Sequence, residues 1–275
     1  LTTGTTVLVI SGIDLRADAA RNMTSGDITG LVVFSDGQEV ARIENFVTAG
    51  SYTDLQTILT EFDNPAPNEG VIGFALANLL LMEPIDVAGS ADRDVFGSSI
   101  VGGDTVALNG GNDAYILDTP AAAVTLDGGS GNDFLQMGFQ RTNGVVIDFG
   151  TGEVIERGTL NLLANFTSFE SGRGSQFDDE FYGADIEGDG YFIEASLGND
   201  NYYMHGDSYV RVSYRFFFEQ TGVAGGIDAN LGTGIVIKPG AGGTDRLFGI
   251  DTLQGTNFDD VFYGSVFNNE FEGMD

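Results

Sequence analysis

Aspartates recur inside glycine-rich turns in the second part of the chain, and these are the residues best suited to do chemistry. Residues 128–136 read Gly-Gly-Ser-Gly-Asn-Asp-Phe-Leu-Gln, and looser versions occur at 108–116, 196–203 and 242–247. Glycine permits the tight bends that let backbone carbonyls converge, and each turn adds one carboxylate. Ca²⁺ is a hard cation that takes six to eight oxygen ligands at about 2.3–2.6 Å. The pattern therefore favours calcium binding, and the alternative is a Gly/Asp loop without metal.

The charge balance favours the same chemistry. The 275 residues include 41 acidic and 11 basic ones, which gives a formal net charge of −30. Such a field repels nucleic acid and anionic membrane surfaces, and it opposes a compact fold unless cations neutralise it. We expect no nucleic-acid partner. A solvated, halophile-like surface is the alternative explanation for the excess acid, whereas 21 Phe and 9 Tyr argue against disorder.

Composition excludes several kinds of catalytic site. The chain has no cysteine, so disulfides, thiol catalysis and Cys–zinc sites are excluded. The single histidine, His205, excludes a two-histidine zinc protease motif, and neither a P-loop nor a Gly-x-Ser-x-Gly elbow is present. No segment reaches the roughly 18–20 apolar residues of a membrane span. We predict no catalytic residue, although carboxylate pairs for glycoside hydrolysis stay open.

The turns recur at nearly constant spacing. Asp94, Asp113 and Asp133 follow one another at intervals of 19 and 20 residues, and Asp179 is followed by Asp200 after 21. Similar turns at constant spacing suggest successive coils of a parallel solenoid, with the turns stacked in a column.

Composition also divides the chain near residue 85. Residues 1–85 contain few glycines and predict a small α+β subdomain, whereas the Gly/Asp repeats of 86–275 predict a mainly β fold, an irregular right-handed parallel β-roll or β-helix. Within the second part a unit of about forty residues occurs twice and closes each time on Phe-Asp-Asp. In the first part we expect strands at 6–11, 31–34 and 39–43 and helices at 52–62 and 71–82.

At residues 128–136 the chain fits the pattern G-G-x-G-x-D-x-U-x at every specified position, with Leu135 as the large apolar residue. Here it resembles the RTX, or hemolysin-type calcium-binding, family. The resemblance covers roughly residues 86–275 and includes the closing phrase at 255–264. One copy of the repeat is perfect and the others are degenerate.

The resemblance implies several Ca²⁺ ions held between neighbouring turns. The turns around Asp200 and Asp245 are its weaker members, because their first glycines or their Gly-x-Asp step are altered. In the two strongest turns, Gly128, Ser130 and Asp133 are implied to share a site with Gly110, Asn112 and Asp113. The predicted metal ligands are Asp94, Gly110, Asn112, Asp113, Gly128, Ser130, Asp133, Asp179, Gly198, Asp200, Asp245 and Asp260.

Stacked turns would place carboxylates beside one another. The chain has a single lysine, Lys238, and we expect no nearby lysine to offset this repulsion. We therefore expect residues 86–275 to depend on calcium for folding, so that metal-binding energy becomes folding energy.

Two further motifs have weaker interpretations. Asp185–Gly190 resembles the start of an EF-hand loop, but the twelfth position is Ser196 instead of Glu, so a loop that assists a neighbouring site is the other interpretation. His205 reads as a turn or surface residue rather than as a catalytic base.

Residues 209–218 alternate as a strand. The alternation is either an insert strand that packs aromatic residues or a docking strip for a glycan or protein. It puts on one face Tyr209, Arg211 and Arg215, together with Ser213 and Phe217.

The residues and the resemblance together favour a secreted, calcium-binding structural protein, a surface-layer, matrix or adhesin component. The resemblance implies type I secretion from a Gram-negative bacterium, folding outside the cell, and self-assembly or a cell-surface glycan as partner. Two alternatives stay open, namely the calcium-folding module of a secreted hydrolase or lyase, and a β-helix carbohydrate-active enzyme. Residues 271–275 resemble the opening of another repeat, so we expect repeats beyond residue 275.

Overall fold

In a computed structural model of the chain, the described residues are 6–17, 23–35, 38–48, 86–97, 102–139, 141–183, 190–204, 209–217 and 221–274. Within them the regular structure is almost entirely β-strand, and from residue 86 onward most strand pairs are parallel. The fold is therefore mainly β, as expected. The two helices predicted at 52–62 and 71–82 lie outside the described residues.

Three long strands open the described chain. They are β1 (Thr6–Ala17), β2 (Met23–Ser35) and β3 (Gln38–Thr48), and they form an antiparallel meander. The three strands include the ranges 6–11, 31–34 and 39–43 expected for them and are longer, and β2 and β3 pair as far as Ser35 and Gln38. β3 also pairs with β4 (Asp86–Ala88), so the meander continues directly into the sheet that follows.

From β4 onward the chain alternates between two sheets. In spatial order, the first sheet continues from β4 with β6 (Thr105–Ala107), β8 (Val124–Asp127), β12 (Leu162–Thr167), β11 (Glu153–Glu156), β10 (Val145–Asp148), β14 (Glu180–Tyr182), β16 (Asn201–Tyr203), β20 (Thr244–Phe248), β19 (Ile235–Ile237), β18 (Asp228–Asn230) and β22 (Val261–Tyr263). The second sheet contains β5 (Val95–Gly97), β7 (Ala114–Leu117), β9 (Phe134–Met137), β13 (Ser171–Arg173), β15 (Tyr191–Glu194), β17 (Val210–Ser213), β21 (Thr252–Gln254) and β23 (Glu270–Glu272).

Central residues of these short strands fill the space between the two sheets. Side chains alternate along a strand, so a strand of three residues can bury little more than its middle one. From the first sheet, the rings of Phe181 and Tyr202 stack 4.9 Å apart within the common core. Five fully buried residues of the second sheet lie in one row across its strands: Tyr115, Leu135, Ile193, Val212 and Leu253.

Two antiparallel hairpins, β10–β11 and β18–β19, interrupt the alternation in the first sheet, and the second strand of each also pairs antiparallel with the strand that follows, β12 or β20. Both hairpins come from the two copies of the long sequence unit. The turn within each hairpin contains Gly-Thr-Gly, whose last residues, Gly152 and Gly234, have φ of 70° and 68°. The side chains of Asp148 and Asn230 accept backbone N–H groups inside these turns. The long repeat therefore encodes a hairpin inserted between parallel strands.

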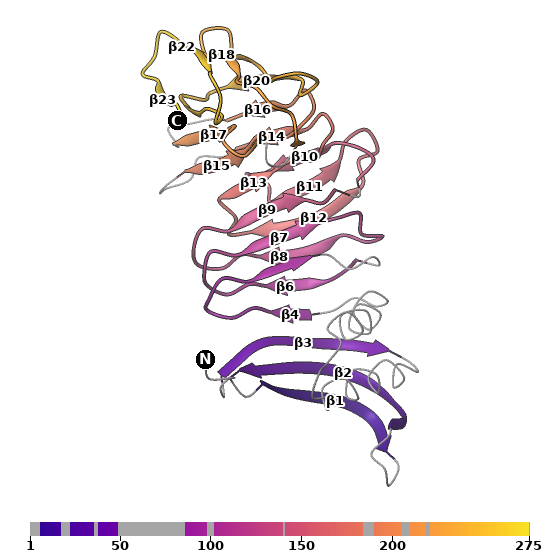
Figure 1. Cartoon of the computed structure of the whole chain (residues 1–275). Coiled ribbons are helices and arrows are strands. Elements are labelled where there is room, and N and C mark those ends of the chain that lie inside the picture. Colours follow the sequence, from indigo (N-terminus) through magenta and orange to yellow (C-terminus); the bar gives the residue numbers. More distant parts are fainter. Residues whose placement is uncertain are drawn as a thin grey trace.

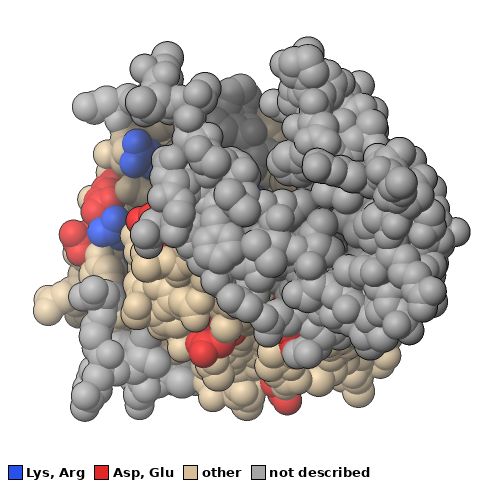
Figure 2. Space-filling model, turned by 90° about the horizontal axis from the view of Figure 1, so that it is seen from below, with Lys and Arg blue, Asp and Glu red and all other residues tan. Residues whose placement is uncertain are grey.

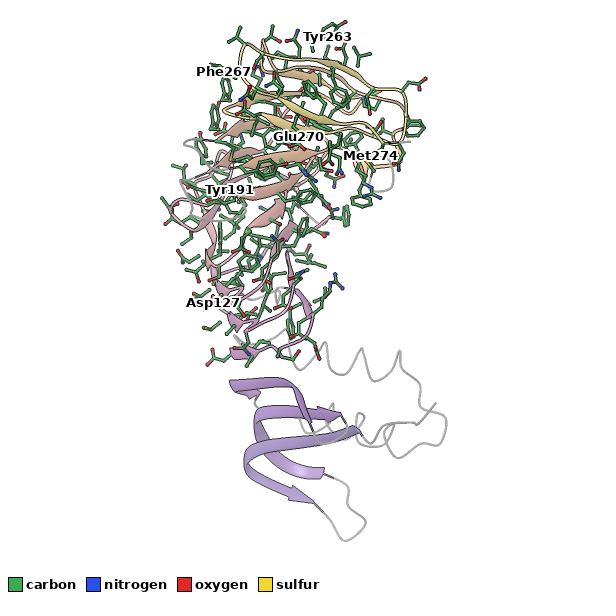
Figure 3. The ribbon with its side chains drawn as sticks, turned by 90° about the vertical axis from the view of Figure 1, so that its left-hand side faces the viewer. Asp127, Tyr191, Tyr263, Phe267, Glu270 and Met274 are labelled. Atoms are coloured by element: carbon green, nitrogen blue, oxygen red, sulfur yellow. The ribbon has the colours of Figure 1, made fainter. Side chains whose placement is uncertain are left out.

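The described strands form an elongated stack, with β1–β3 at one end and β22 and β23 near the other (Figure 1). Figure 3 shows the side chains along this stack, with Asp127 nearer the β1–β3 end and Tyr263 and Phe267 at the far end. Both of these aromatic side chains are exposed. The described residues contain no helix with the length and apolar character needed to cross a membrane.

The two turns that flank β11 give a first test of the fold. Gly152 and Gly158 both have positive φ, but a Cβ at Gly152 would overlap the carbonyl oxygen of Phe166, whereas a Cβ at Gly158 meets nothing within 4 Å. Gly158→Ala should lower the free energy of unfolding by about 1–2 kcal/mol through backbone strain alone. Gly152→Ala should lower it further, because the backbone of β12 must also shift. Urea unfolding measures both, and equal losses would contradict the hairpin geometry.

Candidate metal centre

In three of the turns, the aspartate that ends the turn also closes it. Its carboxylate accepts the backbone N–H of the residue four positions earlier, which follows a glycine. Local bonds of this kind stabilise turns without any metal. In three turns the donor is Ser or Thr: Ser90 to Asp94 at 2.6 Å, Ser175 to Asp179 at 2.7 Å and Thr256 to Asp260 at 2.8 Å.

Asp94, Asp113 and Asp133 also link one turn to the next, and we call them the first ladder. The backbone N–H of Asp94 donates to Oδ1 of Asp113 at 2.7 Å, and that of Asp113 donates to Oδ1 of Asp133 at 2.9 Å. Residues 19 and 20 positions apart in the sequence therefore lie on adjacent turns, as their spacing predicts. The ladder ends at Glu170, whose carboxylate accepts the backbone N–H of Asp133 at 3.0 Å.

The two strongest repeats lie directly against each other. The Gly111 N–H donates to the carbonyl of Ser130 at 3.0 Å, and the Asn132 N–H donates to Oδ1 of Asn112 at 3.0 Å. A Cβ at Gly131, where φ is 143°, would overlap the carbonyl oxygen of Gly111, so only glycine fits. Two adjacent turns thus hold the six residues expected to share a site: Gly110, Asn112 and Asp113 in one, and Gly128, Ser130 and Asp133 in the other.

Asp113 and Asp133 each keep one carboxylate oxygen without a partner. Their side chains are 1% and 0% exposed, and Oδ2 of each is buried and accepts no hydrogen bond from any described residue. A buried carboxylate oxygen in this state is costly, and such groups normally face a donor or a cation. Burial is the main cause of the raised pKa of Asp133, and the carboxylates of Asp113 and Glu170 raise it further. Carboxylate and carbonyl oxygens are the donors that Ca²⁺ prefers.

Asp179, Asp200 and Asp245 form a second ladder. The Asp179 N–H donates to Oδ1 of Asp200 at 3.0 Å, and the Asp200 N–H donates to Oδ1 of Asp245 at 3.1 Å. All three side chains are fully buried. Burial raises the pKa of Asp179 to about 6, although three N–H and O–H groups donate to its carboxylate and oppose the rise.

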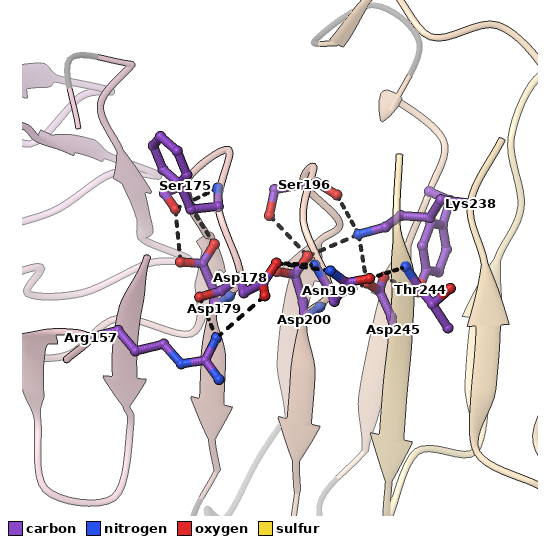
Figure 4. Close-up of polar contacts among 12 residues, drawn as sticks. Arg157, Ser175, Asp178, Asp179, Ser196, Asn199, Asp200, Lys238, Thr244 and Asp245 are labelled. Carbon is purple, nitrogen blue, oxygen red and sulfur yellow. Dashed lines mark hydrogen bonds and ion pairs between the residues drawn. The ribbon is translucent and has the colours of Figure 1, made fainter. Parts of the chain in front are cut away.

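In the second ladder the positive charge comes from Lys238 (Figure 4). Its ammonium lies 2.6 Å from Oδ1 of Asp245 and 3.0 Å from Oδ2 of Asp200. It also donates to the carbonyl of Ser196 at 2.7 Å, and the Tyr214 hydroxyl donates to Oδ2 of Asp245 at 2.8 Å. The expectation that no lysine offsets the stacked carboxylates is therefore wrong for these turns. Lys238 directly follows β19, close in sequence to Asp245 but 38 residues from Asp200.

The electrostatics of this cluster follow from its composition. Burial lowers the pKa of Lys238, but the carboxylates of Asp245 and Asp200 outweigh it, so the pKa is raised and the amine stays an ammonium. Burial and the neighbouring Asp245 raise the pKa of Asp200 well above its ordinary value. One ammonium cannot balance two carboxylates, and the hydroxyl of Tyr214 compensates part of the remainder.

The remaining predicted ligands lie at the margins of these ladders. Gly198 lies in the turn before Asp200, and its N–H donates to the carbonyl of Gly242 at 3.1 Å. Asp260 closes its own turn and accepts the Ile227 N–H at 2.8 Å. The part of the chain that the structure describes holds no cluster of three or more His, Cys, Asp or Glu side chains arranged for a metal. The pair Asp113 and Asp133 has only two carboxylates.

The surface charge is dispersed where it can be seen. Viewed from below the stack, described acidic atoms lie at several separate places, and the described basic atoms lie beside some of them at one side (Figure 2). Among the described residues, Arg157 forms an ion pair with Glu180 at 3.0 Å, and Arg173 forms one with Glu194 at 3.3 Å. Arg141 and Arg211 likewise form ion pairs, with Glu156 and Glu272.

The predicted docking strip is shorter than expected. β17 ends at Ser213, which is buried, and beyond it Arg215 is exposed while Phe217 is buried, so these residues do not share one face. The alternation fails because the chain leaves the strand and turns. Arg211 does contact Tyr209, donating to its hydroxyl at 3.1 Å, and Arg211 also forms an ion pair at 2.8 Å with Glu272.

Two of the weaker motifs cannot be placed. His205 and residues 185–189 of the EF-hand-like motif lie outside the described residues. No model of a known protein family matches the chain, and a search of curated proteins found no relative.

The buried tyrosines provide a matched test of the second ladder. Tyr214 and Tyr202 are both fully buried, but only the Tyr214 hydroxyl has a partner among the described residues, the carboxylate of Asp245. Tyr214→Phe should lower the free energy of unfolding by about 1.5–3 kcal/mol, because a bond to a charged group is lost. Tyr202→Phe should change it little. Chemical denaturation measures both, and an equal effect would contradict the assigned hydrogen bond.

Proposed function

We propose that this chain is a calcium-stabilised structural repeat domain of the RTX type, which works outside the cell as a surface-layer, matrix or adhesin component. The observation that carries the proposal is the pair of unpartnered Oδ2 atoms of Asp113 and Asp133 on adjacent glycine-rich turns. A Ca²⁺ ion held between these turns would supply the missing positive charge. The cation would then join the two turns that the sequence repeat makes most similar.

The donor types around this pair support calcium rather than a softer metal. Gly110, Gly128 and Ser130 offer backbone carbonyls, and Asn112 offers an amide oxygen. Oxygen donors alone suit Ca²⁺, whereas copper and zinc sites draw on histidine or cysteine. The chain has one histidine and no cysteine.

We also propose that residues 86–275 form an irregular parallel β-roll or β-helix. Two observations support this architecture. The strands alternate between two mainly parallel sheets, and equivalent aspartates on adjacent turns are about twenty residues apart. We propose a right-handed coil, since parallel crossover connections are right-handed in nearly all proteins. The hairpins β10–β11 and β18–β19 would be its irregularities.

An extracellular setting is consistent with the charge of the chain. A formal charge of −30 requires abundant counter-ions for a compact state, and extracellular calcium modules work at Ca²⁺ dissociation constants of about 10⁻⁴–10⁻³ M. Folding would then begin only after export. We favour a structural role because the described residues stabilise the stack of strands, through hydrogen bonds in the turns, the aspartate ladders and the hydrophobic core.

Calcium titration tests the metal site. With EGTA, the circular dichroism of the chain should show loss of β-structure and a lower melting temperature, and added CaCl₂ should restore both. At a free Ca²⁺ concentration of one hundred times the dissociation constant, one site contributes about 2.7 kcal/mol. The double variant Asp113→Asn/Asp133→Asn retains the ladder acceptors but removes the charge, so it should lose most of this response.

The matched control is Asp251→Asn, which removes one exposed carboxylate and should respond to calcium as the unmodified chain does. An unmodified chain with the same spectrum and melting temperature in EGTA as in calcium would overturn the proposed function.

Self-assembly tests the surface role separately. We expect the purified chain to form ordered arrays in millimolar calcium and to disperse when a chelator is added, as seen by negative-stain electron microscopy. Particles that stay single at every calcium concentration would contradict a surface-layer role, while calcium-dependent folding would stand on its own evidence.

A further inference from the structure

The buried carboxylates of the two ladders differ in the groups that contact them. In both ladders a backbone N–H of one aspartate donates to Oδ1 of the next, at 2.9 Å between Asp113 and Asp133 and at 3.1 Å between Asp200 and Asp245. All four side chains are buried. Each ladder therefore contains an equivalent pair of stacked carboxylates. The ladders differ in which group, if any, contacts Oδ2 of each aspartate.

In the second ladder every second oxygen has a partner from the chain. Oδ2 of Asp200 receives the ammonium of Lys238, and Oδ2 of Asp245 receives the hydroxyl of Tyr214. In the first ladder Oδ2 of Asp113 and Asp133 are both unpartnered, and neither residue forms an ion pair within the described part of the chain.

The surroundings of Lys238 are built for a fixed cation. Its side chain is fully buried, and its ammonium contacts three oxygens, from Asp200, Asp245 and the carbonyl of Ser196, which matches its three N–H donors. The ring of Phe217 lies 5.8 Å from the ammonium, a distance at which aromatic rings attract cations. The backbone N–H of Lys238 donates to the carbonyl of Gly243 at 3.0 Å. The ammonium is therefore held on all sides.

We propose that the Lys238 ammonium is a built-in cation that takes the place of Ca²⁺ between Asp200 and Asp245. The second ladder then stays folded without calcium, and the calcium dependence of the chain is confined to the first ladder. This inference rests on the proposed function, because it divides the chain into a part that needs the metal and a part that does not.

The consequence is a folding order set by calcium. At low calcium the coils around the second ladder form first, held by the ammonium and the core beneath it. They offer a preformed edge on which the earlier coils can stack. A rise in calcium then completes the first ladder, so one chain has a permanently folded region and a region switched by the metal.

Hydrogen–deuterium exchange of the full chain, read by mass spectrometry, tests this division. Peptides covering 108–113 and 128–133 report the first ladder, and peptides covering 196–200 and 242–247 report the second. In the unmodified chain, EGTA should speed exchange at least tenfold in the first set and leave the second set unchanged. Fast exchange of both sets in EGTA would overturn the built-in cation and leave the calcium function standing. No response of the first set would overturn the proposed function itself.

The variant Lys238→Ala removes the cation and leaves room for a metal. In this variant the second set should exchange fast in EGTA and become slow again in millimolar CaCl₂, so that the second ladder gains a calcium requirement. Unchanged slow exchange in EGTA would overturn the role of the ammonium. The matched control is Arg246→Met, which removes an exposed positive charge from the same strand as Asp245 and should leave both sets as in the unmodified chain.

An uncharged version of the cluster separates the effect of charge from the loss of packing that Lys238→Ala also causes. The triple variant Lys238→Met/Asp200→Asn/Asp245→Asn keeps the side-chain sizes similar and removes all three charges. Its second set should exchange slowly in EGTA, because no cation is then required. Fast exchange in this variant would show that the ammonium acts through something other than charge compensation, and would overturn the proposal.

Discussion

The stack depends on buried aspartates that accept backbone N–H groups from the adjacent turn. These bonds set the register between coils, because each carboxylate meets the aspartate one coil away, as Asp113 meets Asp133 and Asp200 meets Asp245. The arrangement places negative charges close together in a dry environment, where their repulsion is little screened. Every coil therefore needs a source of positive charge or of strong donors.

The chain meets this need in three ways. Where a turn ends in Asp94, Asp179 or Asp260, N–H and O–H groups of the same turn or a neighbouring hairpin satisfy the carboxylate. The cluster around Lys238 uses an ammonium supplied by a hairpin insert. Oδ2 of Asp113 and Asp133 receives neither, and a metal is the remaining solution that we propose. The same turn motif thus has its carboxylate compensated in different ways, depending on which groups the neighbouring elements place beside it.

Much of the stack could be predicted from the sequence because its determinants are local and periodic. Intervals of 19 and 20 residues predicted which aspartates lie on adjacent turns, and the glycines of 128–131 predicted a tight bend. The chemistry of the second ladder could not be predicted in this way. Lys238 and Asp200 are 38 residues apart, and the antiparallel hairpin between them breaks the period on which the spacing argument rests. The strip beyond Ser213 was misjudged for a related reason, since alternation holds only while the strand continues.

The central claim is that the two ladders use different cations, Ca²⁺ in the first and the ammonium of Lys238 in the second. A crystal structure of the chain grown in calcium, with anomalous scattering data, would locate the ions directly. We expect an ion between the Oδ2 atoms of Asp113 and Asp133, and the ammonium of Lys238 instead of an ion between Asp200 and Asp245. Ordered turns around Asp113 and Asp133 without an ion, in a crystal that contains calcium, would contradict this explanation of the stack.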